Sequence, residues 1–80
     1  MALNEINKFI AYDAAAVTPS DTVPNNFAYL YVGTGGNIAV VTEAGNSVTL
    51  NNYPSGAYLW LRVTKVMNTN TTASNIVGFH

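Results

Sequence analysis

The chain has 80 residues, no cysteine, one histidine and a formal net charge of −1, and only 9% of its residues are charged. This composition excludes disulfides and cysteine-ligated zinc, and three basic residues are too few for a nucleic-acid interface. No run approaches the ~20 apolar residues that span a bilayer, so no membrane segment is expected. A domain this small buries only about 60% of its unfolded surface, and a nearly uncharged surface favours association. We therefore expect contacts with other subunits to stabilise it.

Residues 1–12 (MALNEINKFIAY) are predicted to form a short N-terminal arm, separate from a single domain over residues 13–80. Its apolar side chains recur at roughly helical spacing, but a segment this short is marginal as an isolated helix. Two interpretations stay open: a terminal turn folded back on its own domain, or an arm that becomes ordered on a neighbouring subunit. The segment lacks the basic-then-apolar layout of a secretory signal, so folding in a cytoplasm is expected.

The domain begins with a short strand predicted over residues 14–17 and an irregular, proline-containing connection to residue 26. Residues 27–42 then read FAYLYV-GTGG-NIAVVT, two β-branched and aromatic runs around a glycine-rich loop, and this pattern predicts a β-hairpin. Both faces of the second run are apolar, which indicates a strand covered on both sides. Because glycine tolerates positive φ angles, we assign a structural turn role to Gly33, Gly35 and Gly36.

Short strands separated by turns rich in glycine and asparagine continue to the C-terminus. They are predicted over residues 47–50, 57–64 and 75–80, with a possible continuation of the second through residue 67. No helical periodicity appears in the body of the chain. The pattern predicts an all-β fold, a small single-domain antiparallel β-sandwich or barrel of six to seven short strands.

The predicted strand over residues 57–64 carries the candidate binding face. Leucine and valine side chains point to one side, and Tyr58, Trp60 and Arg62 point to the other. Because aromatic residues and arginine are enriched at interface hot spots, we prefer a protein interface. An ordinary second core face, with Arg62 reaching solvent, and a platform for sugar rings stay open as alternatives. The candidate interface residues are Leu3, Ile6, Phe9, Ile10, Tyr12, Tyr58, Trp60 and Arg62.

No catalytic constellation emerges from the sequence. The four acidic residues lie in separate segments, and no nucleophile is matched with a base. The loop over residues 33–36 lacks the third glycine and the following helix of a dinucleotide-binding loop, and it has no Walker lysine. We therefore predict that the protein is not an enzyme and that it uses neither a cofactor nor a metal.

Three stretches resemble a known family: AAAVTPSDT from residue 14, LYVGTGGNIAVV from residue 30 and LRVTKVMNTNTTASNIV from residue 61. They are similar to the short spike-base proteins of phage heads and gene-transfer-agent particles, a family of capsid-attached β proteins. The most specific part is LYVGTGG, followed later by RVT and a threonine-rich loop. The N-terminal arm and the aromatic segment over residues 58–60 have no counterpart in that pattern.

The resemblance implies a non-enzymatic structural virion protein on the outer surface of a phage capsid, either a cement or decoration protein or a head spike base. Its implied partners are the major capsid protein, further copies of itself in a trimer or pentamer, and a spike or fibre protein. It would be assembled in the bacterial host cytoplasm. The alternative is a carbohydrate-binding module that uses Tyr58 and Trp60 to attach to host surface polysaccharide.

Overall fold

The computed structural model describes residues 11–80, so the predicted arm residues Leu3, Ile6, Phe9 and Ile10 lie outside the described range. The division into an arm over residues 1–12 and a domain over residues 13–80 stays a prediction. The described strands are β1 (Ala14–Ala16), β2 (Tyr29–Thr34), β3 (Gly36–Thr42), β4 (Ser47–Tyr53), β5 (Ala57–Leu59), β6 (Val63–Val66) and β7 (Ser74–Phe79).

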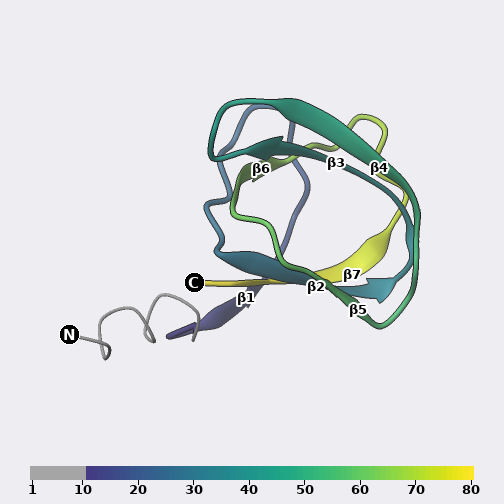
Figure 1. Ribbon diagram of the computed structural model, residues 1–80, viewed down its shortest axis with the longest axis horizontal. Coiled ribbons are helices and arrows are strands. Elements are labelled where there is room, and N and C mark those ends of the chain that lie inside the picture. Colours follow the sequence, from purple (N-terminus) through teal and green to yellow (C-terminus); the bar gives the residue numbers. More distant parts are fainter. Residues whose placement is uncertain (1–10) are drawn as a thin grey trace.

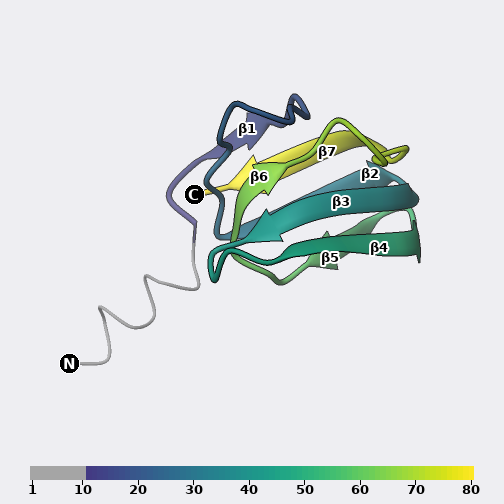
Figure 2. The same ribbon diagram turned by 90° about the horizontal axis from the view of Figure 1, so that it is seen from above.

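These seven strands form two sheets in which every pairing between named strands is antiparallel. One sheet has four strands in the order β1-β7-β2-β5, and the other has three in the order β4-β3-β6. The two sheets face each other, with β6 over β7 and β3 over β2 (Figures 1 and 2). No helix occurs between residues 11 and 80. The predicted all-β antiparallel sandwich of six to seven short strands is confirmed.

The core lies between the sheets and draws on both of them. Along β2, Leu30 and Val32 point inward and are buried, while Tyr29 and Tyr31 alternate with them and point outward. Within residues 11–80 no polar or charged side chain is buried, so apolar burial stabilises this core. Each fully buried side chain of this kind contributes about 1.5–3 kcal/mol. The most deeply buried are Leu30, Val32, Ile38, Val40, Val63 and Val66.

The hairpin predicted over residues 27–42 is wrong. β2 pairs with β5 and β7, whereas β3 pairs with β4 and β6, so these consecutive strands belong to different sheets. The chain crosses from one sheet to the other at Gly35, which lies between the two strands (Figure 1). Glycines signal a change of direction, but they do not determine whether the flanking strands pair with each other or with later strands.

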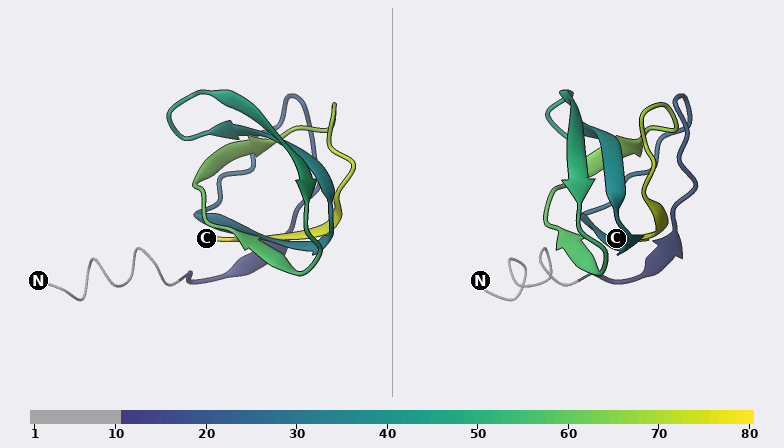
Figure 3. Two further views of the ribbon diagram at one scale, coloured as in Figure 1. Left: turned by 45° about the vertical axis from the view of Figure 1, so that its right-hand side comes forward. Right: turned by 90° about the vertical axis from the view of Figure 1, so that its right-hand side faces the viewer.

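The strand predicted over residues 57–64 is divided in two. β5 ends at Leu59 in the four-stranded sheet and β6 begins at Val63 in the three-stranded sheet, and the segment between them crosses from one sheet to the other (Figure 3). The N–H of Leu61 donates to the carbonyl of Leu59 at 2.9 Å, a three-residue turn centred on Trp60. Leu59 and Val63 are buried and Trp60 is exposed, so the predicted alternation is confirmed although the strand is interrupted.

β3 is the central strand of its sheet, and the apolar pattern that predicts cover on both faces is confirmed at Ile38, Ala39 and Val40, whereas Val41 is only partly buried. Ile38 and Val40 face the core, and Ala39 on the other face is buried as well. The Ala39 N–H donates to Thr71 Oγ1 at 3.0 Å, and its carbonyl accepts the N–H of Met67 at 2.8 Å. Residues of the chain after β6 therefore form hydrogen bonds with both the backbone N–H and the carbonyl of Ala39.

Close backbone approach constrains the glycines at the β2–β3 crossing. A Cβ atom on Gly35 would overlap the carbonyl oxygen of Tyr53 and would lie 2.7 Å from the amide nitrogen of Ser55. A Cβ atom on Gly33 or Gly36 would lie 2.7 or 2.9 Å from the nearest backbone atom of another strand or loop. The Gly35 N–H also donates to Ser55 Oγ at 2.7 Å. The crossing thus packs against the β4–β5 turn, and this contact leaves no room for a side chain.

We predict that Gly35→Ala lowers the free energy of unfolding by about 3 kcal/mol or more, because rotation of a side chain cannot relieve overlap with backbone. Gly45 provides a matched control, since its Cβ atom would meet nothing within 4 Å and only its φ of 94° opposes substitution. Gly45→Ala should cost about 1–2 kcal/mol. Urea denaturation measures both values. Equal losses in the two variants would contradict the close-approach explanation.

Candidate functional site

Five aromatic side chains gather on the outer face of the four-stranded sheet. The strand register brings them together, because Tyr31 lies opposite Tyr58 and Tyr29 lies opposite Phe79 in antiparallel pairs. Side chains at such positions on one face are close enough to interact. Trp60, one residue beyond β5, completes the group through its contact with Tyr29. We call this surface the aromatic face, and it consists of Tyr29, Tyr31, Tyr58, Trp60 and Phe79.

Two stacked pairs organise the aromatic face. The ring centroids of Tyr58 and Trp60 are 5.0 Å apart with an interplanar angle of 10°, and those of Tyr29 and Phe79 are 4.9 Å apart at 15°. Tyr29 and Trp60, 4.9 Å apart, join the two pairs, and Tyr31 meets Tyr58 edge-on at 5.1 Å. Such pairs contribute about 0.5–1.5 kcal/mol beyond the area they bury. The rings therefore orient one another into one continuous surface.

The aromatic face is open to solvent at its β5 edge. Trp60 is 71% exposed and Tyr58 is 43% exposed, while the other three rings are partly buried. The hydroxyl of Tyr53 donates to the carbonyl of Tyr58 at 2.7 Å and helps to hold this edge in place. None of the five side chains carries a formal charge. A contiguous, uncharged aromatic surface on so small a domain is typical of an interaction site.

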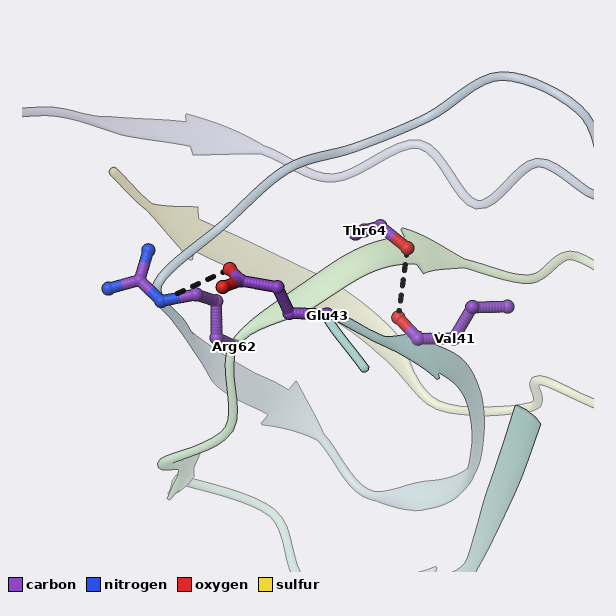
Figure 4. A network of polar contacts seen from close by, with 4 residues as sticks. All are labelled: Val41, Glu43, Arg62 and Thr64. Atoms are coloured by element: carbon purple, nitrogen blue, oxygen red, sulfur yellow. Dashed lines mark hydrogen bonds and ion pairs between the residues drawn. The ribbon is translucent and has the colours of Figure 1, made fainter. Parts of the chain in front are cut away.

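Arg62 lies with the β3–β4 turn rather than with the aromatic face. Its Nε atom is 3.4 Å from Glu43 Oε1 (Figure 4). Its carbonyl accepts the Glu43 N–H at 3.1 Å. Both side chains are exposed, so the ion pair adds little stability. Nearby, the Thr64 hydroxyl donates to the carbonyl of Val41 at 3.3 Å, where the register between β3 and β6 shifts. The turn at Trp60 directs the chain toward the three-stranded sheet, so Arg62 lies beside Glu43 and not on the aromatic face.

The structure brings together two of the predicted interface residues, Tyr58 and Trp60, and adds three that sequence reasoning missed. Alternation along β2 could have pointed to Tyr29 and Tyr31, because both alternate with apolar residues. The register that sets them beside Phe79 involves strands far apart in the sequence and has no local signal. Tyr12 is 98% exposed, and an interface role for Tyr12, Arg62 or the arm stays a prediction.

Asp21, which lies outside the aromatic face, has a structural role. Asp21 joins two loops: its Oδ1 accepts the N–H groups of Asn68 and Thr69 at 2.9 Å each, and its Oδ2 accepts the Thr69 hydroxyl at 2.5 Å. These hydrogen bonds, the Thr69 hydroxyl first among them, hold the pKa of Asp21 below its usual value.

Within residues 11–80 no group of three or more His, Cys, Asp or Glu could hold a metal ion. The same range contains no helix long and apolar enough to cross a membrane.

Comparison with known proteins identifies the class to which this sandwich belongs. No protein-family model and no curated protein matches the sequence. Among solved structures, a chain of the "Capsid of native GTA particle computed with C5 symmetry", a gene-transfer-agent capsid, matches with a TM-score of 0.77 and 33% identity. The match covers 88% of this chain and 83% of that chain. The protein is therefore related to the proteins of phage-like capsids.

More specifically, the chain belongs to the same family as that chain of the gene-transfer-agent capsid. The resemblance to proteins of gene-transfer-agent particles is confirmed to this extent. The finer assignment to a head spike base stays a prediction.

We predict that acid destabilises the protein partly through Asp21. Because its pKa is lowered on folding, the ionised carboxylate stabilises the fold fully above its unfolded pKa of about 3.8. This stabilisation is lost as the pH falls through the lower folded pKa. Denaturation measured between pH 6 and pH 2 should show a shallower decline for Asp21→Asn, and a partial reduction for Thr69→Val. Parallel profiles for wild type and Asp21→Asn would exclude this contribution.

Proposed function

We propose that the chain is a non-enzymatic structural protein of a virion, bound to the outer surface of a phage-like capsid as a cement or decoration protein or as a head spike base. The observation that carries this proposal is the kinship with a gene-transfer-agent capsid chain, at 33% identity over most of both chains. The two coverages make the chains similar in length.

The aromatic face supplies the surface for protein–protein contact in this proposal. Tyrosine and tryptophan are enriched at interface hot spots, and Trp60 and Tyr58 are the most exposed members of the face. Removing their rings from water is favourable by about 25 cal/mol for each Å² of apolar area. Binding to the folded state also stabilises a small domain by mass action. The interface thus serves both attachment and stability.

The proposed partners are the major capsid protein and further copies of this chain in a trimer or pentamer. A spike or fibre protein is added where the oligomer is a spike base. The related capsid was computed with C5 symmetry, which a pentameric ring around a vertex would match. The protein would be located on the capsid exterior, after assembly in the cytoplasm of the bacterial host.

A carbohydrate-binding module is the second candidate, and one observation favours it. Tyr58 and Trp60 form a nearly parallel stacked pair, and an exposed tryptophan ring such as that of Trp60 can stack on a sugar ring. A glycan array probed with wild type and Trp60→Ser tests this function. Reproducible binding that the substitution abolishes would support it, whereas no binding by wild type would leave the capsid role as the better explanation.

We predict that Trp60→Ser reduces incorporation into particles that lack the wild-type protein by at least about tenfold, because a hot-spot tryptophan contributes 2 kcal/mol or more. Val23→Ser is the matched control, since it removes an apolar side chain that is 59% exposed and lies outside the aromatic face. Quantitative mass spectrometry of purified particles measures incorporation, and thermal melting checks that both variants fold.

Two outcomes of this experiment count against the proposal in different ways. Normal incorporation of both variants would exclude the aromatic face as the attachment surface. Failure of the wild-type protein to enter particles at all would overturn the proposed function itself.

A further inference from the structure

The aromatic face and the beginning of the described chain lie at the same end of the four-stranded sheet. Ala14 of β1 is paired with Phe79 of β7, and the N–H groups of Tyr12 and Asp13 both donate to the carbonyl of His80, at 2.8 and 2.6 Å. β1 and the C-terminus lie side by side at this end (Figures 1 and 2). Residues 1–10 therefore join the domain next to the rings at the Phe79 end of the face.

The composition of residues 1–10 complements the aromatic face. The segment reads MALNEINKFI, and its two charged residues, one acidic and one basic, cancel. Ten residues reach about 33 Å when extended and about 15 Å as a helix. The four strands span about 14 Å across the sheet. The segment is thus long enough to cover the face in either conformation, and its large apolar side chains are Leu3, Ile6, Phe9 and Ile10.

The direction of the chain favours a second copy as the acceptor of this segment. β1 begins at the end of the sheet where β7 finishes, so the described chain enters the sheet from that end. Docking on the chain's own face would require a reversal just before Tyr12. Residues 9–12 include no glycine, proline, asparagine, aspartate or serine, the residue types that dominate tight turns. The Asp13 side chain is already used, because its Oδ1 accepts the Ala14 N–H at 2.8 Å.

We infer that residues 1–10 of one copy bind the aromatic face of the next copy. The contact is head-to-tail, and a head-to-tail contact generates a closed ring when its rotation closes. The net charge of −1 leaves little repulsion between copies. This inference rests on the proposed function only in treating the aromatic face as a surface for protein contact. Its test uses the isolated protein, without capsid.

A complementation experiment with the full-length chain tests the inference. Phe9→Ser weakens the donor segment and leaves the face intact, whereas Trp60→Ser weakens the face and leaves the donor intact. We expect wild type to form oligomers at micromolar concentration in analytical ultracentrifugation. Each variant alone should self-associate at least about a hundredfold more weakly, and their equimolar mixture should form a heterodimer.

Tryptophan fluorescence provides a second readout, because Trp60 is the only tryptophan in the chain. In the mixture the signal comes only from the Phe9→Ser subunit, and its emission should shift to the blue as the donor segment covers Trp60. A synthetic peptide of residues 1–10, added in excess to the wild-type protein, should compete and dissociate the oligomer. The same peptide carrying Phe9→Ser should not. This competition needs no variant of the protein.

Several results would overturn the inference. They are a monomeric wild type at micromolar concentration, a mixture of variants that does not associate, or a wild-type oligomer that the peptide leaves intact. A Phe9→Ser variant that melts at a much lower temperature but associates normally would assign the segment to its own domain. Any of these results leaves the particle-incorporation test unaffected, so failure of this inference is distinct from failure of the proposed function.

Discussion

The contact between the β2–β3 crossing and the β4–β5 turn governs the rest of the structure. At Gly35 the chain passes from the four-stranded to the three-stranded sheet, and the turn between β4 and β5 packs directly against it. Because no side chain intervenes, the sheets close on this side with backbone against backbone. The chain changes sheet between β2 and β3 and again between β4 and β5, and the large apolar side chains of both sheets meet in one core. A small domain without disulfides depends on collecting its apolar side chains into one such core.

The same arrangement explains why aromatic residues remain outside. A sheet presents side chains alternately to its two faces, so filling the core with Leu30 and Val32 leaves Tyr29 and Tyr31 on the other face. The neighbouring strands contribute Tyr58 and Phe79 in register with them. The four-stranded sheet is therefore apolar on both faces, with one face used for folding. The second face is available for a partner, and its rings hold one another in position before any partner binds.

Local patterns in the sequence predict the fold class and the in–out alternation, but they do not predict the pairing of strands. Buried and exposed residues still alternate around Trp60 although the strand is interrupted there, because successive side chains of an extended chain point to opposite sides. The hairpin over residues 27–42 fails because glycine spacing reports a bend and carries no information on distant partners. For the same reason, Tyr58 and Trp60 are found from one segment, whereas Tyr29, Tyr31 and Phe79 require the register. Arg62 is predicted on the same side as Tyr58 and Trp60, but the crossing between the sheets turns its side chain toward Glu43.

The central proposal is that this domain lies on the exterior of a phage-like capsid and that its aromatic face makes a protein contact there. Cryo-EM of the native particle tests it most directly, since the map would locate the sandwich and show what covers Trp60. We expect density for the domain on the outer surface, in rings of several copies, with Trp60 buried in a protein contact. Particles without this density, or domains bound with Trp60 facing solvent, would contradict the proposal.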